Sequence, residues 1–240
     1  MIVKLTISYD GSKFYGSQIQ PSKDTVHGRI SLALKTLGIN SIINFSGRTD
    51  KNVHATMQVI SFELPLYWFD LKKLEEKLIS FLPISIKLHN ISNESDTFHA
   101  RFSAKKRSYR FIISKKELTA FNSSYMAYYN DINKGLLNKA CKSFIGIHDF
   151  EYFHKIGSEP ASTIREIYDA RFYEYKDMYI FKFTANSYLR SQIRMMVYAL
   201  LEVSNNNISI LELEEQINKK KIHTRKLASP FGLYLSKIYY

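Results

Sequence analysis

Residues able to do chemistry are concentrated in one short segment of this sequence. It contains a carboxylate, Asp50, two positions after a guanidinium, Arg48, and Gly47 allows another backbone to approach closely. Apolar patterns on both sides predict strands, so the segment is expected to be a loop held by a rigid scaffold. A sheltered carboxylate in such a loop can serve as nucleophile or general base. A surface turn with a solvated ion pair fits the same residues. The segment reads Ser46-Gly47-Arg48-Thr49-Asp50-Lys51-Asn52-Val53-His54-Ala55.

A second segment, residues 98–111, mixes basic residues with aromatic ones. Cations suit contacts with phosphate groups, and rings suit stacking on bases. Tyr109 shares a predicted strand face with Phe111 and Ile113, so we expect it to point at a sheet surface. A tyrosine of the core, with its hydroxyl bonded, fits that position as well as a stacking platform does. The candidate RNA contacts in this segment are Arg101, Lys105, Lys106, Arg107 and Arg110.

A third candidate is Arg194, on a predicted helix. It follows Arg190 by four residues and precedes Val197 by three, which places it at the margin of the buried stripe. A half-buried guanidinium needs a carboxylate or phosphate partner. An ordinary ion pair at the rim of the helix is the alternative. Arg190 is a further candidate contact for RNA.

The composition bounds the class of protein. The 240 residues carry a net charge of +12, and 45% of them are hydrophobic. That apolar content is typical of a globular chain and excludes a disordered one. The basic balance indicates an acidic partner, which could be nucleic acid, a membrane surface or an acidic protein. A general excess of lysine that only keeps the chain soluble is the alternative.

Several classes of site are disfavoured. Cys141 is the single cysteine, so the chain has neither a disulfide framework nor a cysteine metal cluster, which fits a reducing cytoplasm. The histidines lack metal-ligand spacing, and neither a P-loop nor GxGxxG is present, so we expect no metal and no nucleotide cofactor. No apolar run approaches the roughly 18 residues of a membrane span, and the alternating amino terminus reads as a strand and not as a signal peptide.

The elements that must position these residues form two series. Apolar alternation predicts strands at 3–9, 42–45, 57–64 and 84–88, with helices at 26–37 and 71–81 capped by Thr25 and Asp70. In the second half the same reasoning predicts strands at 107–113, 164–174, 178–184 and 232–238. It predicts helices at 132–144, 187–203 and 210–217. This order indicates an α+β fold. Element order places a boundary near residues 100–105, dividing the chain into 1–103, with the loop of Asp50, and 104–240.

Taken together, the motifs resemble the TruA-type tRNA pseudouridine synthases nearly end to end. The resemblance rests on several segments in the right order, since a lone Gly-Arg-Thr-Asp would be weak. The matching segments are Tyr9-Asp10-Gly11 with Gly16 and Gln18, Thr25-Val26-His27-Gly28, Ser46 to Asp50 with Val53-His54-Ala55, Phe98 to Ala104 with Tyr109-Arg110, Phe144 with Gly146, His148-Asp149-Phe150 and Phe153, Tyr188-Leu189 with Ile193-Arg194 and Val197, and Ser229-Pro230 with Gly232 to Leu235.

The sequence departs from the family pattern at four positions. Ser17 stands where the family usually has Trp, Gln192 where it has Met, and Tyr198 where it has a small Gly. Asn52 replaces a usual Gly, and because Asn tolerates the left-handed backbone, we expect the turn to survive. None of these positions is Asp50, Tyr109 or Arg194, but they put the details of tRNA docking in doubt.

The resemblance implies a fold and an activity. The fold is two ferredoxin-like, RRM-like halves sharing a mainly antiparallel sheet, with helices on one side and a central catalytic cleft. The activity is conversion of uridine to pseudouridine at positions 38 to 40 of the tRNA anticodon stem-loop, without cofactor or metal. The family also implies a homodimer, with one tRNA contacting both subunits.

Pseudouridine formation breaks the bond from N1 to C1′ and forms one from C5 to C1′, with no net change in atoms or redox state. Asp50 can act as nucleophile at C1′ or as base at C2′, and the sequence does not choose between them. Arg194 is the expected cation that keeps Asp50 ionised. Arg48 is expected to support the loop or hold the extruded nucleotide, and Tyr109 to lie under the uracil, with a role in proton transfer left open.

Two other functions are alternatives for the same residues. A non-catalytic RNA-binding protein with paired RRM-like halves would use the same basic and aromatic surface, but the chain lacks an RNP1-like pattern. A hydrolase of sugar substrates normally needs a second carboxylate across the scissile bond, and the motif of Asp50 offers none. Conversion of tRNA uridine without a change of mass would separate isomerisation from both.

Overall fold

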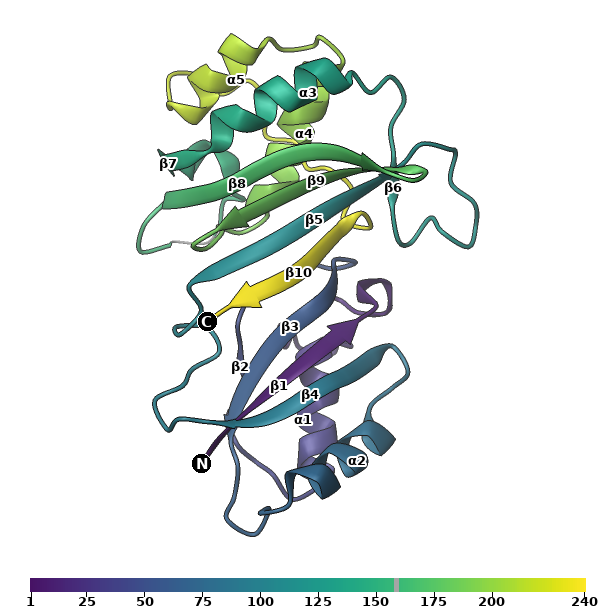
Figure 1. Cartoon of the computed structure of the whole chain (residues 1–240), viewed down its shortest axis with the longest axis vertical. Helices are drawn as coiled ribbons and strands as arrows, with labels where there is room; N and C mark the ends of the chain where they lie inside the picture. Colours follow the sequence, from purple (N-terminus) through teal and green to yellow (C-terminus); the bar gives the residue numbers. More distant parts are fainter. Residues whose placement is uncertain (158–159) are drawn as a thin grey trace. The chain divides into compact units, whose positions relative to one another are not determined.

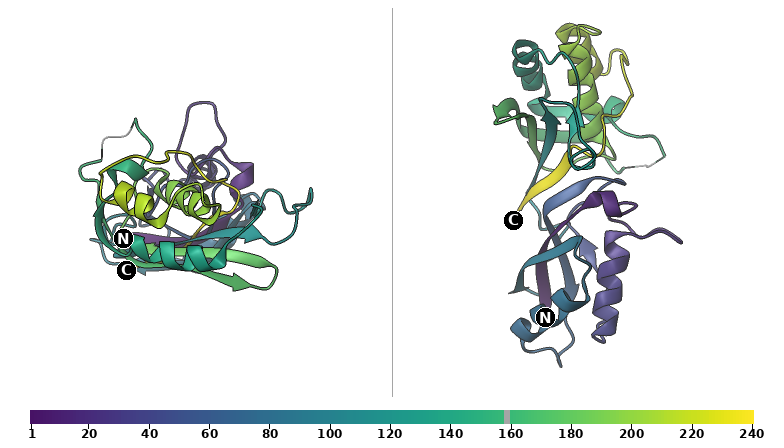
Figure 2. Two further views of the ribbon diagram at one scale, coloured as in Figure 1. Left: turned by 90° about the horizontal axis from the view of Figure 1, so that it is seen from above. Right: turned by 90° about the vertical axis from the view of Figure 1, so that its right-hand side faces the viewer.

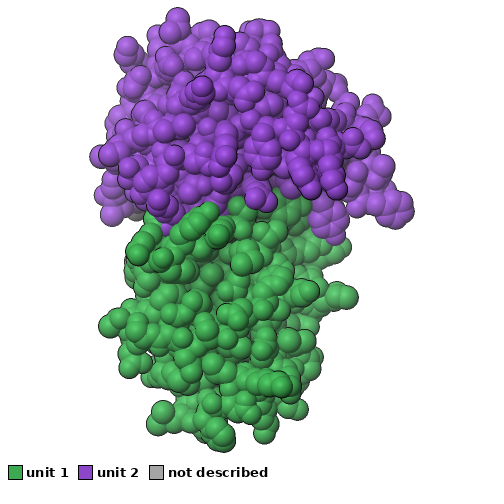
Figure 3. Space-filling view, viewed as in Figure 1, with its two compact units in different colours: residues 1–105, 234–240 green, residues 106–233 purple. Residues whose placement is uncertain are grey.

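The computed structural model describes residues 1–157 and 160–240 and divides the chain into two compact units (Figure 3). The first comprises Met1–Lys105 with Tyr234–Tyr240, and the second comprises Lys106–Leu233. Each unit is described separately. The division predicted at 103/104 stays a prediction.

The first unit is a sheet with helices against one face (Figures 1 and 2). Its strands run in the order β4-β1-β3-β10, and β2 pairs with β3. The pairs of β1 with β3 and β4 are antiparallel, and β10 is parallel to β3. The elements are β1 (Ile2–Tyr9), η1 (Gly11–Lys13), α1 (Val26–Thr36), β2 (Asn44–Phe45), β3 (His54–Glu63), α2 (Leu71–Phe81), β4 (Ile86–Glu94) and β10 (Leu233–Tyr239).

Local sequence signals explain these elements. Alternate residues of β1 are buried, from Val3 to Tyr9, as the period of a half-buried strand requires. The predicted caps are both present, because the side chain of Thr25 accepts from the N–H of Gly28 at 3.1 Å and that of Asp70 from Lys73 at 3.0 Å. The sequence therefore fixes where both helices begin.

The second unit has an antiparallel sheet in the order β5-β9-β8-β7, with β6 parallel to β5. Phe111, Phe181 and Phe172 lie in register across its three long strands and are buried. Its elements are β5 (Lys106–Ser114), β6 (Ala127–Tyr128), α3 (Lys134–Ala140), η2 (Cys141–Phe144), β7 (Gly146–Asp149), η3 (Phe150–Phe153), β8 (Ile164–Tyr175), β9 (Met178–Ala185), α4 (Gln192–Ser204) and α5 (Ile210–Ile217).

The α+β class and the mainly antiparallel pairing are confirmed. The predicted helix at 187–203 begins later, at Gln192, because Ser191 takes a left-handed backbone with φ of 58°. The predicted helix at 132–144 becomes a 3-10 turn from Cys141. Within the residues that the structure describes, no helix is long and apolar enough to span a membrane.

Candidate active site

Asp50 lies in the loop that connects β2 to β3 in the first unit. Its side chain is half-buried, Thr49 before it is buried, and Arg48 is exposed. A turn closes the loop, because the N–H of Val53 donates to the carbonyl of Asp50 at 3.1 Å. Asn52 within this turn has φ of 65°, which confirms the expected left-handed geometry. The loop therefore has one defined path and presents a carboxylate that is partly sheltered from water.

The segment after β1 holds the loop at Thr49, the residue before Asp50. The N–H of Thr49 donates to Oγ of Ser17 at 2.9 Å, and the N–H of Ser17 donates to the carbonyl of Thr49 at 3.1 Å. The hydroxyl groups of Tyr9 and Thr49 are 2.8 Å apart. Three atoms of Thr49 are thus fixed by neighbours that are almost completely buried. Such support restricts where the next side chain, Asp50, can point.

Two glycines permit this contact. A Cβ at Gly16, where φ is 96°, would lie 2.8 Å from the carbonyl oxygen of Thr49. A Cβ at Gly11 would lie 2.1 Å from the carbonyl oxygen of Val53. Both distances are too short for any side chain, so the backbone after β1 can approach the loop only with glycine at these positions. The motif Tyr9-Asp10-Gly11 with Gly16 therefore positions the loop of Asp50.

Gln58 on β3 supports the same loop from beneath and was missed by sequence reasoning. Its side chain is fully buried, donates to the carbonyl of Gly47 at 2.8 Å and accepts from Oγ of Ser46 at 2.7 Å. Its Nε2 also lies 3.5 Å from the hydroxyl of Tyr9. A polar side chain within a strand of buried residues was the available signal.

Burial raises the pKa of Tyr9 to about 12, so this phenol is neutral at physiological pH.

His54, in the matched Val-His-Ala stretch, has a structural contact. Its Nδ1 accepts a hydrogen bond from the N–H of Gly11 at 3.0 Å, and its ring stacks on Tyr234 with centroids 4.6 Å apart. The same Nδ1 lies 3.4 Å from Oδ1 of Asp10. His54 thus ties the start of β3 to the turn after β1.

In the second unit, Tyr109 lies on β5 opposite Phe183 of β9. Its side chain is buried, and its ring meets Tyr188 edge-on, with centroids 5.3 Å apart and planes at 83°. It shares the sheet face with Phe111, as predicted. This packing leaves the ring little freedom, which suits a stacking platform as much as a core residue.

Arg194 of α4 is half-buried and held by the segment before β10. Its Nε donates to the carbonyl of Ala228 at 2.8 Å, and the N–H of Ala228 donates to the carbonyl of Arg194 at 3.0 Å. The next N–H, that of Ser229, donates to the hydroxyl of Tyr129 at 3.1 Å. Burial raises the pKa of Tyr129, and the positive charge of Arg194 opposes that rise. Ala228, just before the matched Ser229-Pro230 stretch, therefore holds Arg194 in place, a role that sequence reasoning did not foresee.

The comparisons with known proteins decide the family. The family described as "tRNA pseudouridine synthase" matches residues 5–103 and 140–240. A curated protein of Campylobacter jejuni named "tRNA pseudouridine synthase A" is 42% identical over 240 residues, covering 100% of both chains. Proteins with the same name from Wolinella succinogenes and Helicobacter pylori are each 39% identical, covering 97% and 99% of this chain and 92% and 98% of their own.

The chain belongs to the tRNA pseudouridine synthase family. The resemblance to its TruA-type members is confirmed, and the α+β class and mainly antiparallel pairing agree with the fold of this family. The chain is accordingly an enzyme, an isomerase that converts uridine to pseudouridine in tRNA.

Three departures from the family pattern have defined contacts in this synthase. Ser17 accepts from Thr49, as described above, through a side chain that is 1% exposed. Gln192 is fully buried at the start of α4, and its Oε1 accepts from the N–H of Leu189 at 2.8 Å. Tyr198 is half-buried, and the ammonium of Lys226 lies 5.9 Å from its ring centroid. The first two polar side chains therefore bond backbone groups that apolar residues could not.

The matched stretch from Phe144 to Phe153 forms a packing cluster in this synthase. Phe144, Phe150 and Phe153 are fully buried, and their ring centroids lie 5.4 to 6.4 Å apart. Asp149 between them accepts from the N–H of Glu151 at 3.1 Å and so caps η3. These contacts explain the motif through the core of the second unit.

The predicted RNA contacts fall into two groups. Arg107 is buried, and its Nη1 donates to the carbonyl of Asn186 at 2.9 Å, so it is part of the interior of the second unit. Arg110 points to the opposite face of the sheet from Tyr109, because successive strand residues alternate. The exposed ones are Arg101, Lys105, Lys106, Arg110 and Arg190. Contact with RNA stays a prediction for each of them.

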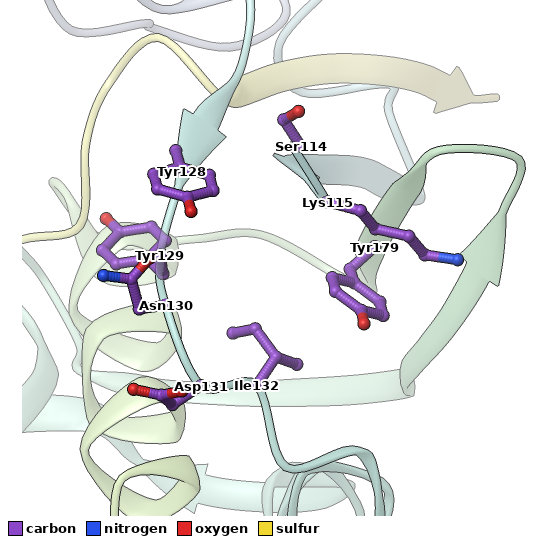
Figure 4. A pocket seen from close by; sticks show the side chains of 8 residues that line it. All are labelled: Ser114, Lys115, Tyr128, Tyr129, Asn130, Asp131, Ile132 and Tyr179. Carbon is purple, nitrogen blue, oxygen red and sulfur yellow. The ribbon is translucent and has the colours of Figure 1, made fainter. Parts of the chain in front are cut away.

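The second unit contains a pocket. Its volume is about 370 Å³, and its lining includes three tyrosines, Tyr128, Tyr129 and Tyr179 (Figure 4). None of the predicted site residues lines it. In the described ranges, 1–157 and 160–240, no three His, Cys, Asp or Glu side chains gather as metal ligands would.

Proposed function

We propose that this synthase acts on the anticodon stem-loop of tRNA, at positions 38 to 40, with Asp50 as its catalytic carboxylate and without a cofactor. The observation that most favours a catalytic role for Asp50 is that neighbouring residues hold its loop in place. A half-buried carboxylate follows a residue fixed at three atoms by Ser17 and Tyr9. A catalytic group held in this way loses little entropy when the reaction begins.

The reaction is a rearrangement, so its atoms balance without a co-reactant. The bond from N1 to C1′ breaks, the uracil turns, and a bond from C5 to C1′ forms. The proton on C5 is lost and N1 gains one. Asp50 can start this by attacking C1′ as a nucleophile, and its bond to C1′ then breaks as the C5 bond forms. Alternatively it removes the C2′ proton as a base and returns that proton to C2′ when the C5 bond forms. Both routes need its ionised form.

The other predicted residues have supporting roles in this proposal. Arg194 supplies the positive charge that favours ionised Asp50, and its half-buried guanidinium, fixed by Ala228, suits that task. Tyr109 supplies a rigid ring for the uracil of the extruded nucleotide, and its hydroxyl takes part in proton transfer. Arg48 is exposed beside Asp50 and is free to contact the phosphate of that nucleotide.

The assembly and location of the enzyme are also proposals. We expect a homodimer in which one tRNA contacts both subunits, and we expect it in the cytoplasm, where its substrate is processed. Light scattering of the purified chain, alone and with tRNA, measures the stoichiometry directly.

The experiment compares the wild type with Asp50→Asn on uridine-containing tRNA transcripts. Single-turnover rates are followed by carbodiimide-stop mapping, which also locates the product. We expect Asp50→Asn to lower the rate by at least about a thousandfold and to change tRNA affinity by less than about threefold, because the amide is isosteric but neither base nor nucleophile.

Asp96→Asn is the matched control, because this carboxylate is 89% exposed in the same unit, and it should react like the wild type. Substantial activity of Asp50→Asn would remove Asp50 from the mechanism. Product found only outside the anticodon stem-loop would refute the proposed substrate region and leave Asp50 in place.

A further inference from the structure

An exposed aromatic ring lies between two lysines beside the loop of Asp50. The side chain of Tyr15 is 41% exposed. The ammonium of Lys51 lies 4.2 Å from the centroid of its ring, and that of Lys23 lies 4.8 Å from it. A large ring at the surface, bracketed by cations, is the combination that single-stranded nucleic acid binds through base stacking and phosphate contacts.

This cluster, Tyr15 with Lys23 and Lys51, is connected to the loop through the backbone. Lys51 directly follows Asp50 in the chain. Gly16 directly follows Tyr15, and its Cβ position would be 3.3 Å from the carbonyl carbon of Asp50. The ring and the carboxylate therefore belong to one small region of the first unit.

The backbone of Tyr15 is itself held in place. Its N–H donates to the carbonyl of Asp24 at 2.8 Å, and its carbonyl accepts from Nε2 of Gln20 at 2.6 Å. The ring consequently projects from a fixed turn. A rigid aromatic side chain loses little entropy when a base stacks on it.

The charges of the cluster are not neutralised by carboxylates. In the described part of the chain, neither Lys23 nor Lys51 forms an ion pair. The neighbouring Asp24 is engaged by Arg29 through two hydrogen bonds, of 2.8 and 2.6 Å. An exposed cation–π contact is weak, and the two ammonium groups repel each other. An anion such as a phosphodiester would relieve that repulsion.

We propose that Tyr15, Lys23 and Lys51 form a subsite for the nucleotide next to the target uridine. The inference rests on the proposed function, because the target must leave its stack to reach Asp50. Its departure uncovers one face of the neighbouring base. The ring of Tyr15 covers that face, and the two ammonium groups contact the phosphates on either side.

The test uses the full chain and a tRNA transcript. Tyr15→Leu removes the stacking surface, and we expect about tenfold weaker tRNA binding with a limiting single-turnover rate within about threefold of the wild type. The double variant Lys23→Gln/Lys51→Gln should lower the slope of log affinity against log salt by about 1 to 2, as the loss of one or two phosphate contacts requires.

Two controls separate binding from folding. Tyr15→Phe keeps the ring and should bind like the wild type, and Lys77→Gln removes an exposed lysine from α2 and should leave the salt slope unchanged. A lowered melting temperature with unchanged binding in Tyr15→Leu and in the double lysine variant would mean that the cluster only stabilises its turn, which overturns the proposal.

The same measurements distinguish a failure of the proposed function from a failure of the subsite alone. If the wild type binds tRNA but makes no pseudouridine in the anticodon stem-loop, the proposed function fails, whatever the variants do. If the wild type is active there and the Tyr15 and lysine variants bind as it does, only the subsite fails.

Discussion

The backbone N–H of Thr49 donates to the side-chain oxygen of Ser17 at 2.9 Å, one residue before Asp50. A second hydrogen bond joins the same two residues in the opposite direction, because the N–H of Ser17 donates to the carbonyl of Thr49 at 3.1 Å. Both side chains are buried. An N–H left unsatisfied at such a place costs about 1–3 kcal/mol, so the pair specifies the path of the loop.

Replacing Ser17 by Ala should therefore harm catalysis more than binding. We expect the limiting single-turnover rate of Ser17→Ala to fall by about tenfold, because a shift of the carboxylate by less than 1 Å is costly. The concentration of tRNA at half-saturation should stay within about twofold.

Ser17→Thr keeps the acceptor oxygen and should recover most of the rate, whereas Ser80→Ala removes an exposed hydroxyl from α2 and should have no effect. A Ser17→Ala enzyme with weakened binding and a normal limiting rate would contradict a positioning role. The split between rate and affinity is the informative readout, since a loss of stability alone would not produce it.

Tyr109→Phe tests the phenol hydroxyl without moving the ring. The packing against Tyr188 is through ring edges and faces, so the Phe ring should stay in place. We expect tRNA affinity within about twofold of the wild type and a rate reduced by about a hundredfold, the size of a lost proton-transfer contribution. Normal product formation would show that only the ring is needed.

Tyr188→Phe is the matched control for that variant. Its hydroxyl is buried and, among the described residues, has no hydrogen-bond partner, and burial raises its pKa well above the usual value. Removing such a group should leave the rate unchanged and stabilise the fold by up to about 1 kcal/mol, measured by urea unfolding.

Local patterns in the sequence were sufficient for much of the fold. Apolar alternation predicted β1, and the caps Thr25 and Asp70 are present as expected, because these signals act over a few residues. The left-handed turn at Asn52 was foreseen from the family pattern, because Gly usually stands at this position and Asn tolerates the same backbone.

Contacts between distant segments could not be predicted in this way. The pairing of Ser17 with Thr49 joins residues 32 apart, and that of Arg194 with Ala228 joins residues 34 apart. Arg107 belongs to a basic run that would be expected at the surface, but it is buried and donates a hydrogen bond to the carbonyl of Asn186. Tertiary partners decide such positions, and a single sequence does not contain them.

The buried Arg107 and the exposed Lys105 and Lys106 should consequently behave differently. Lys105→Gln/Lys106→Gln should lower the salt slope of tRNA binding by about 1 to 2 with little change in melting temperature. Arg107→Gln removes the donor to the carbonyl of Asn186, so its main effect should be a loss of about 1–3 kcal/mol in the free energy of unfolding. An unchanged salt slope in the lysine pair would exclude them from phosphate contacts.

The buried phenol of Tyr9 predicts that the folded state loses stability at alkaline pH. Burial raises its pKa in the folded state from 10.0 to about 12, so between these values the unfolded chain loses the phenol proton and the folded chain keeps it. The unfolded state then binds fewer protons, and stability falls as pH rises through this window. The two pKa units correspond to about 3 kcal/mol in the free energy of unfolding, and below pH 10 this contribution is fully present.

Melting temperatures of the wild type and Tyr9→Phe, measured from pH 8 to 12, test this directly. At pH 8 the variant should be less stable, because the hydroxyl of Thr49 loses its partner. Toward pH 12 the difference should shrink or reverse, since the Phe variant has no phenol to ionise at this site. Tyr175→Phe removes an exposed phenol and should melt in parallel with the wild type at every pH. A constant gap between wild type and Tyr9→Phe would mean that Tyr9 ionises as readily in the folded chain as in the unfolded one.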